Sequence, residues 1–381
     1  MTVPRATPIP IPIPIPIPIP IPIPIPASRE RPLVAELPEI GRDVPFRALV
    51  HAPTKVEPCT AIEPFLGRGG VFQKRDDQVS PLYGGNKVRR FEYLLADAEA
   101  RGAKHLVTVG GLASTQVMAT ILFGRGAGFD VTAVLFDQPV TRFARDALLT
   151  GAAGGGNLVY GGGYASTAVR TIQAFRRVEK PYLILPGASN PLALLGYVDA
   201  MLELGEQVRR GECPQPDVIV VPAGSGGTLA ALAVGAAMLK WDVLITGVRI
   251  TDLIACNRVT VGFLIGSLRR FLGRRAAAAK EIRMDRVRVA IHHGAIGRGY
   301  GYPTSAAIDA VPEVERLLGV PGEITYSGKG LVGLRAVAAE HPTRTILYWH
   351  TLSSAPRPRP LALPDALPGG FAPAFAGDVA I

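Results

Sequence analysis

The sequence predicts an α/β fold of two domains, in which parallel sheets are covered by helices on both faces. Short apolar strands alternate with helical stretches along most of the chain. These strands are apolar throughout, which is typical of parallel sheets that are buried on both sides. The chain has 381 residues, of which 48% are hydrophobic, and this length favours two domains.

The alternation begins with a helix that is expected from Val88 to Leu95. Strands are expected at 107–109, 131–136, 158–160, 182–185, 218–221, 243–248, 287–293 and 345–348. Helices are expected at 115–123, 142–149, 166–177 and 229–240. Ligands of parallel α/β sheets bind in the loops that follow the carboxyl ends of strands, so the chemistry is sought in those loops.

The two ends of the chain are rich in proline. Residues 8–26 are a strict Ile-Pro alternation, and residues 355–373 form a second proline-rich stretch. Proline at every second position excludes a helix and pushes the intervening residues to extended backbone. Residues 1–36 are therefore expected to be a disordered or polyproline II tail, with a ligand for a proline-binding partner as the alternative. The repeat cannot span a membrane, where its backbone groups would be unsatisfied, and it does not resemble a signal peptide.

The net charge of +10 raises the question of a nucleic-acid partner. The arginines are scattered, apart from a local cluster between Arg269 and Arg275, and no extended basic stretch interleaved with aromatic residues accompanies them. A small anionic ligand explains a modest positive excess better than a nucleic acid does. We expect neither a nucleic-acid nor a membrane partner.

The cysteines and histidines suggest neither a disulfide framework nor a metal site. Cys59, Cys213 and Cys256 show no paired spacing, and a reducing cytoplasm is the expected compartment. His292 and His293 are neighbours, but on a strand they would point to opposite faces.

The segment Gly84-Gly85-Asn86-Lys87 runs directly into the first expected helix. Glycine permits backbone that other residues avoid, so the lysine can be held rigidly at this junction. If its surroundings are also dry, its ammonium loses a proton more easily, which suits Schiff-base chemistry. The alternative is a solvated lysine at the start of a helix.

A second signal follows the strand at 218–221. The loop Ala223-Gly224-Ser225-Gly226-Gly227-Thr228 leads into a helical run. A glycine-rich turn at a helix N-terminus directs several backbone amides, and the positive end of the helix dipole, at one point. The loop lacks a P-loop lysine and the spacing of a dinucleotide motif, which favours a single phosphate as its ligand. A plain tight turn into a helix is the alternative.

The same loop is a near match to the nucleophile elbow of serine hydrolases, with Ser225 as the nucleophile. Alanine stands where that motif requires glycine, and two glycines follow the serine. An anion-binding loop is therefore favoured.

Several further segments accompany the lysine turn and the glycine-rich loop. They are Lys74 to Asp77, Gly110 to Ser114, Gly187 to Asn190, Gly196 to Val198, Gly297 to Thr304 and Tyr326 to Lys329. Together, from about Pro45 to Thr351, they resemble pyridoxal-phosphate enzymes of the tryptophan-synthase β fold. The nearest branch holds D-cysteine desulfhydrase and 1-aminocyclopropane-1-carboxylate deaminase.

The resemblance implies roles for the matching residues. Lys87 would form a Schiff base with pyridoxal 5'-phosphate and act as the base at the substrate α-carbon, and Tyr326 and Tyr300 would complete the catalytic pocket. The implied cofactor contacts are Asn86, Lys87, Thr115, Gly224, Ser225, Gly226, Gly227, Thr228, Ser327 and Thr351. The implied substrate contacts are Ser114, Thr115 and Gln116. Either tyrosine could instead be a buried aromatic residue with a satisfied hydroxyl.

The position after Tyr326 distinguishes two reactions. The deaminase has a glutamate there, which keeps the pyridine nitrogen protonated, whereas this chain has Ser327, with Thr351 further along. A neutral hydroxyl stabilises a pyridinium less than a carboxylate does. A weaker electron sink suits β-elimination, so D-cysteine desulfhydrase-like activity is favoured over cyclopropane opening. Cysteate cleavage, which is also a β-elimination, stays open as an alternative.

Two departures from the branch are expected to matter. Thr115 stands where the branch has asparagine, and Leu352 stands where it has glycine. Both are compatible with a shifted substrate or with a catalytically impaired homologue that still binds the cofactor.

The resemblance also implies the domain organisation. A small domain, residues 96–191, would be inserted into a large cofactor-binding domain formed by residues 37–95 and 192–354. The cofactor would lie in the cleft between them, and residues 355–381 would form a C-terminal tail. A homodimer acting on a small amino acid is expected.

Overall fold

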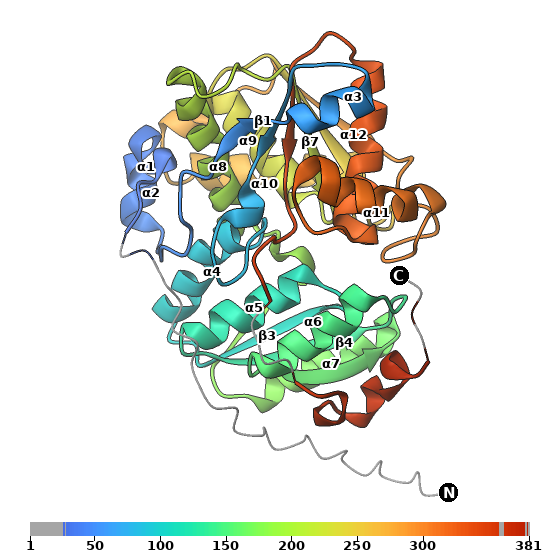
Figure 1. Cartoon of the computed structure of the whole chain (residues 1–381). Helices are drawn as coiled ribbons and strands as arrows, with labels where there is room; N and C mark the ends of the chain where they lie inside the picture. Colours follow the sequence, from blue (N-terminus) through green and yellow to red (C-terminus); the bar gives the residue numbers. More distant parts are fainter. Residues whose placement is uncertain (1–25, 27, 358–361, 378, 380–381) are drawn as a thin grey trace, which may run out of the picture.

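The computed structural model describes residue 26 and residues 28–357, 362–377 and 379. Apart from Pro26, the Ile-Pro repeat predicted to be a tail lies outside these residues. The described chain forms two separate sheets, each with its own covering helices (Figure 1). Within the described ranges, every helix is too short or too polar to span a bilayer.

The larger sheet has six strands in the order β1-β2-β10-β7-β8-β9. These are β1 (Val56–Pro58), β2 (Val71–Lys74), β7 (Val218–Ala223), β8 (Val243–Arg249), β9 (Val287–His292) and β10 (Ile346–Trp349). All neighbouring strands are parallel except β1 and β2. The four strands predicted in this region are confirmed, whereas β1 and β2 were not predicted because three or four residues are too few to show a pattern.

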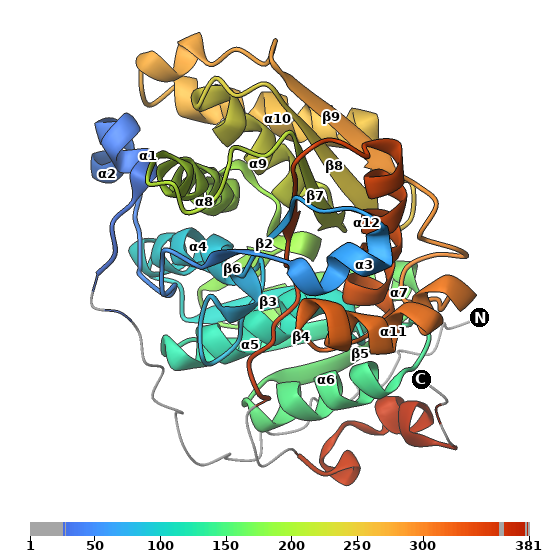
Figure 2. The ribbon, with the colours of Figure 1, turned by 45° about the horizontal axis from the view of Figure 1, so that its top comes forward.

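Helices cover both faces of this sheet (Figure 2). One face packs on α8 (Pro191–Arg209), α9 (Gly227–Met238) and α10 (Arg258–Gly273), and the other on α11 (Ser305–Leu318) and α12 (Lys329–Glu340). In β7, Ile219 and Val221 join the first core, while Val218 and Val220 join the second. Both faces of the strand are therefore buried, which explains its continuous apolar sequence.

The smaller sheet has four parallel strands in the order β5-β4-β3-β6. They are β3 (His105–Gly111), β4 (Asp130–Phe136), β5 (Asn157–Gly162) and β6 (Pro181–Ile184). Helices α5 (Thr115–Gly126) and α6 (Arg142–Ala153) pack on one face, and α7 (Tyr164–Arg177) packs on the other. The predicted strands and helices of this region are confirmed. All four strands fall within residues 96–191, and all six strands of the larger sheet fall outside that range.

The N-terminal boundary differs from the prediction. Helices α1 (Pro32–Glu36) and α2 (Pro38–Asp43) lie beside α8 (Figures 1 and 2). Leu33 is fully buried, and the Arg29 guanidinium lies 2.8 Å from Glu92 and 3.5 Å from Asp199. The tail predicted for residues 1–36 therefore ends before Arg29. Both helices are short and begin at prolines, so they show no hydrophobic period.

The C-terminal segment packs against the smaller sheet. The Phe371 side chain is buried, and its ring meets that of Tyr160 edge-on at a centroid distance of 5.5 Å. The Arg145 side chain, from α6, donates a 2.8 Å hydrogen bond to the carbonyl of Ala374.

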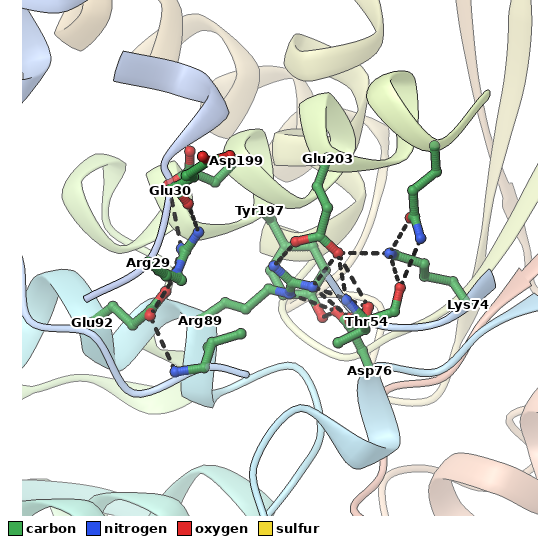
Figure 3. Close-up of polar contacts among 12 residues, drawn as sticks. Arg29, Glu30, Thr54, Lys74, Asp76, Arg89, Glu92, Tyr197, Asp199 and Glu203 are labelled. Carbon is green, nitrogen blue, oxygen red and sulfur yellow. Dashed lines mark hydrogen bonds and ion pairs between the residues drawn. The ribbon is translucent and has the colours of Figure 1, made fainter. Parts of the chain in front are cut away.

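Helix α4 (Val88–Ala100) lies between the two sheets and is anchored by a buried network of charges (Figure 3). Its Arg89 guanidinium lies 2.8 Å from Asp76, after β2, and 2.9 Å from Glu203, on α8. Lys74, at the end of β2, lies 2.6 Å from Glu203. Burial by itself would raise the pKa of Glu203, but Arg89 and Lys74 hold that pKa well below its usual range.

Replacing Arg29 by alanine should destabilise the protein. The change would leave the buried carboxylates of Glu92 and Asp199 without their cation, and breaking such a pair costs about 3–5 kcal/mol. Urea unfolding gives the free energy, and Arg42→Ala, at an exposed site in α2, should change it by less than about 0.5 kcal/mol. Equal losses in the two variants would show that the Arg29 contact contributes nothing specific.

Stability should also depend on His350 at mildly acidic pH. Its Nε2 lies 2.8 Å from the Gln73 side-chain oxygen, and burial lowers its pKa from 6.5 to about 4. Between pH 6.5 and 4 the unfolded chain binds a proton at His350 that the folded chain does not. Because of His350, the free energy of unfolding should therefore fall by about 1.4 kcal/mol for each unit by which the pH is lowered in this range. Wild type should lose about 2 kcal/mol more than His350→Gln between pH 6.5 and 5, and parallel curves would contradict the assignment.

Candidate active site

The lysine turn is held by backbone contacts that only glycine allows. A Cβ on Gly84 would lie 1.8 Å from the carbonyl oxygen of Asp77, and one on Gly85, whose φ is +86°, would lie 2.5 Å from that of Thr351. The amide of Gly85 donates to Asp76 at 2.7 Å, and the amide of Asn86 donates to Thr351 at 3.1 Å. The turn is therefore fixed between the ends of β2 and β10, with Lys87 at the N-terminus of α4.

The protein around Lys87 favours the neutral amine. The Lys87 side chain as a whole is partly exposed to solvent. Its amine is nevertheless surrounded by protein, and this burial lowers its pKa well below the ordinary value. Repulsion from the nearby Arg90 guanidinium lowers that pKa further. A neutral amine can act as a nucleophile or accept a proton, as the sequence predicted for this lysine.

The glycine-rich loop lies directly against the lysine turn. The Asn86 side-chain amide donates to Thr228 Oγ1 at 3.0 Å, although more than 100 residues separate them. Gly226 adopts φ +75°, and α9 begins at Gly227. A Cβ on Gly227 would lie 2.5 Å from the Ser189 hydroxyl. The loop thus exposes backbone amides at a helix N-terminus, which is an arrangement that binds anions.

Arg90, which sequence reasoning missed, supplies a cation to this loop. It is 1% exposed, and its guanidinium donates to Thr228 Oγ1 at 2.7 Å, to Ser189 Oγ at 2.8 Å and to the carbonyl of Gly187. Among the described residues, none of its partners is a carboxylate and its Nε has no partner. Burial without a counter-charge lowers the pKa of Arg90 to about 10. An anion at the loop would supply the missing charge. The sequence feature that could have identified Arg90 is its position one helical turn after Lys87.

Two tyrosines lie together near the start of α5. The hydroxyl groups of Tyr300 and Tyr326 lie 2.7 Å apart, and that of Tyr326 is also close to Thr115. Thr115 begins α5, whose N-terminal cap is the side chain of Ser114. Tyr326 belongs to a π-helical turn, Ile324–Gly328, that precedes α12. Two of the predicted catalytic residues, Tyr300 and Tyr326, therefore lie beside the predicted substrate-binding residue Thr115.

Comparison with known proteins agrees with this geometry. Residues 48–351 match the model of the pyridoxal-phosphate-dependent enzyme family. The chain is 31% identical over 305 residues to a D-cysteine desulfhydrase from Salmonella paratyphi C, covering 76% of this chain and 87% of that protein. The chain belongs to the pyridoxal-phosphate-dependent enzymes.

Solved structures support the same assignment. An ACC deaminase homologue superposes with a TM-score of 0.70 and 26% identity, covering 86% of this chain and 96% of its own. A maize serine racemase (TM-score 0.53, 17% identity) covers 84% of this chain and 92% of its own, and at that identity it supports the fold alone. The predicted fold, that of the tryptophan-synthase β type, is confirmed.

The residues present fit pyridoxal phosphate. Arg90 and the amides at the start of α9 would hold the phosphate, and Lys87 would offer an amine of lowered pKa to the aldehyde. The hydroxyl of Thr351, at the end of β10, is buried and has no partner among the described residues. It is therefore free to contact a polar edge of the cofactor ring.

Three predicted site residues use their side chains elsewhere. The Ser327 hydroxyl donates to the carbonyls of Pro321 and Glu323 within its own turn. The Gln116 amide donates to Thr108 and Thr120 inside the smaller domain. The Ser225 hydroxyl lies 2.6 Å from that of Ser189. Their predicted contacts with cofactor or substrate remain predictions.

The serine hydrolase and the metal site, two alternative interpretations of the sequence, gain no support. Ser225 pairs with a serine, not with the histidine that a hydrolase nucleophile needs. His293 accepts a 2.8 Å hydrogen bond from Arg249. In the described part of the chain, no three His, Cys, Asp or Glu side chains gather as a metal site.

Lys329 connects the two segments that carry Tyr300 and Tyr326. Its ammonium, at the start of α12, donates to the carbonyls of Ile296 at 2.8 Å and Gly299 at 3.2 Å, which belong to the loop that carries Tyr300. Burial lowers the pKa of Lys329 to about 8. The contacts tie the Tyr300 loop to the turn that carries Tyr326.

Arg90→Met should separate phosphate binding from folding. Removal of a buried cation that lacks a counter-charge should leave the cofactor-free protein at least as stable as wild type. It should weaken pyridoxal phosphate binding about 10- to 100-fold, the value of a hydrogen bond to a charged group. Thermal unfolding without phosphate measures the stability of the cofactor-free protein. The rise in Tm on adding inorganic phosphate, which stands in for the phosphate group of the cofactor, measures the binding.

Arg101→Met, at the exposed end of α4, is the matched control and should respond to phosphate like wild type. If Arg90→Met were stabilised by phosphate as much as wild type is, the phosphate would bind elsewhere.

Proposed function

We propose that this enzyme catalyses β-elimination from a small amino acid, with D-cysteine as the substrate and pyruvate, ammonia and hydrogen sulfide as the products. The observation that carries the proposal is the amine of Lys87, whose pKa the surrounding protein lowers and whose turn contacts the glycine-rich loop at Thr228. The 31% identity to a protein named D-cysteine desulfhydrase supports the choice of substrate.

Lys87 would move the proton that starts the reaction. Bound pyridoxal phosphate would supply an electron sink that makes the substrate α-proton acidic. Burial and Arg90 keep the pKa of Lys87 low, so its amine is available to accept that proton. Arg90 and the loop from Gly224 to Thr228 would hold the phosphate, which fixes the cofactor relative to Lys87.

The start of α5 would bind the substrate carboxylate. Ser114 and Thr115 stand at a helix N-terminus, where unpaired amides and the helix dipole attract an anion. Tyr326 contacts Thr115 at the same place, and burial raises its pKa, so its hydroxyl stays protonated and can donate to the departing sulfur.

Among the described residues, the carboxylate that contacts the Tyr326 turn is already paired, which favours elimination over cyclopropane opening. Ser327 follows Tyr326, and the nearby Glu323 carboxylate already accepts hydrogen bonds from the amides of Thr325, Tyr326 and Ser327. The free polar group is the neutral hydroxyl of Thr351. A neutral partner leaves the cofactor a weaker electron sink, which is sufficient when a good leaving group departs.

A substrate panel tests the proposal. The purified protein should show a visible absorption band with pyridoxal phosphate that borohydride removes. It should release keto acid from D-cysteine faster than from L-cysteine, L-cysteate or 1-aminocyclopropane-1-carboxylate. Lys87→Ala should lose both the band and the activity, whereas Lys55→Ala, at an exposed site, should keep both.

Each other outcome selects an alternative. Product from the cyclopropane alone would overturn the argument from Ser327 and Thr351. A band with no product from any compound would favour a catalytically impaired homologue, consistent with Thr115 and Leu352. The homodimer and the cytoplasmic location expected from the sequence remain predictions.

A further inference from the structure

Neither of the two predicted catalytic tyrosines stands on an α-helix or a strand. Tyr300 lies in the loop of residues 293–304, between β9 and α11, and Tyr326 lies in the π-helical turn that precedes α12. In the loop, Gly297 and Gly301 adopt φ values of +66° and +75°, a backbone conformation that other residues rarely adopt. A glycine-rich loop does not by itself fix a side chain, so the position of Tyr300 depends on contacts from other segments.

A buried ammonium from α12 supplies such a contact. The Lys329 side chain is 0% exposed, and its ammonium donates to the carbonyls of Ile296 at 2.8 Å and Gly299 at 3.2 Å. The second of these carbonyls immediately precedes Tyr300, and the Tyr302 amide reaches it at the longer distance of 3.3 Å. Hydrogen bonds from a charged donor are about twice as strong as neutral ones. One charged group therefore holds two positions of the loop.

The turn that carries Tyr326 is held by a charge of the opposite sign. The Glu323 carboxylate accepts hydrogen bonds from the amides of Thr325 and Ser327 at 2.8 Å, and also from that of Tyr326. Burial raises the pKa of Glu323 and lowers that of Lys329, and the attraction between the two charges opposes both shifts. A carboxylate that binds amides and an ammonium that binds carbonyls thus fix the two tyrosine segments and stabilise each other's charge.

Asp252, which follows β8, is the other carboxylate that acts on Lys329. A Cβ on Gly299 would lie 2.9 Å from the Asp252 Oδ1 atom, so Asp252 packs against the same loop. Its negative charge, like that of Glu323, favours the charged form of Lys329. In the described part of the chain, the hydrogen bonds of the ammonium nevertheless go to the loop carbonyls. The charge of Lys329 is therefore directed at the loop that carries Tyr300.

We propose that Lys329 is a positioning residue for the reaction, and that its charged ammonium acts as an internal cation that holds Tyr300 against Tyr326. The hydroxyl groups of these tyrosines lie 2.7 Å apart, so a small displacement of the loop would separate them. Tyr326 would then lack the partner that orients its hydroxyl toward the departing group. This inference rests on the proposed β-elimination and adds a residue on which its rate depends.

The first experiment removes the charge of Lys329. In Lys329→Met, kcat for D-cysteine should fall about 10- to 100-fold, the cost of a misplaced catalytic group, while KM should change less than about threefold. Lys329→Arg keeps a positive charge and several donors, and should retain kcat within about fivefold of wild type. Lys280→Met, at an exposed site, is the control and should match wild type. An unchanged kcat in Lys329→Met would overturn the proposal.

The second experiment follows the loop in the wild-type holoenzyme without turnover. Burial lowers the pKa of Lys329 to about 8 and raises those of Tyr300 and Tyr326, so Lys329 loses its proton before either tyrosine does. Between about pH 7 and 9.5, the protection of amides 297–302 against hydrogen exchange, corrected for the intrinsic rate, should fall about 10-fold, the value of a hydrogen bond to a charged group. Constant protection over this range would contradict the proposal.

Two comparisons assign that change to Lys329. Amides 229–237, in the buried helix α9, should keep their protection at both pH values. In Lys329→Met, amides 297–302 should show the lower protection at both pH values. Burial also lowers the pKa of Lys87, but a change caused by Lys87 would persist in Lys329→Met and would contradict the assignment.

Together the two measurements distinguish this inference from the proposed function. A loss of protection that depends on Lys329, in a protein without lyase activity, would support the internal cation and contradict the elimination. Turnover of D-cysteine at an equal rate in wild type and Lys329→Met would support the elimination and overturn the internal cation.

Discussion

The contact between Arg89 and Asp76 is the constraint on which the site depends. Asp76 accepts hydrogen bonds from Arg89, Thr54 and Tyr197, and also from the indole of Trp349 on β10 (Figure 3). Its backbone carbonyl accepts from Gly85, in the lysine turn. One residue, Asp76 at the end of β2, thus joins the lysine turn to α4, α8 and β10. A buried network of this kind is unfavourable when only partly satisfied, so its complete pairing fixes a single position for Lys87.

Arg89 and Arg90 are neighbours on α4, both fully buried, and they show opposite electrostatics. Arg89 has two carboxylate partners, which raise its pKa despite burial, whereas Arg90 has hydroxyl and carbonyl partners and a lowered pKa. The two side chains leave the helix about 100° apart, so one faces the charged network and the other faces the glycine-rich loop. One therefore stabilises the fold, and the other lacks a counter-charge until an anion binds. The repulsion from Arg90 that depresses the pKa of Lys87 is part of the same arrangement.

Much of this organisation was visible in the sequence, because continuous apolar strands and glycine-rich turns depend on local chemistry. The strands β3 to β10 belong to that class, whereas the pairing of Lys87 with the loop at Gly224 was implied by the resemblance to a known family. What the sequence did not show depends on long-range contacts between polar side chains. Arginine is usually a surface residue, and only the fold of this chain buries Arg90 against Thr228. The Ser327 hydroxyl was expected at the cofactor, but the π-helical turn directs it to its own backbone. The helices at 32–43 were missed because Arg29 and Leu33 are held by tertiary contacts rather than by a periodic pattern.

The tyrosine pair joins the two domains near the start of α5. Tyr326, from the large domain, contacts Thr115 of the small domain, and the ring of Tyr300 lies so close to Gly111 that a Cβ there would be 3.1 Å away. These contacts join the two domains beside the predicted site. The Lys329 ammonium in turn ties the loop that carries Tyr300 to the turn that carries Tyr326. The predicted substrate-binding end of α5 is therefore held against the large domain by the same two tyrosines that are predicted to be catalytic.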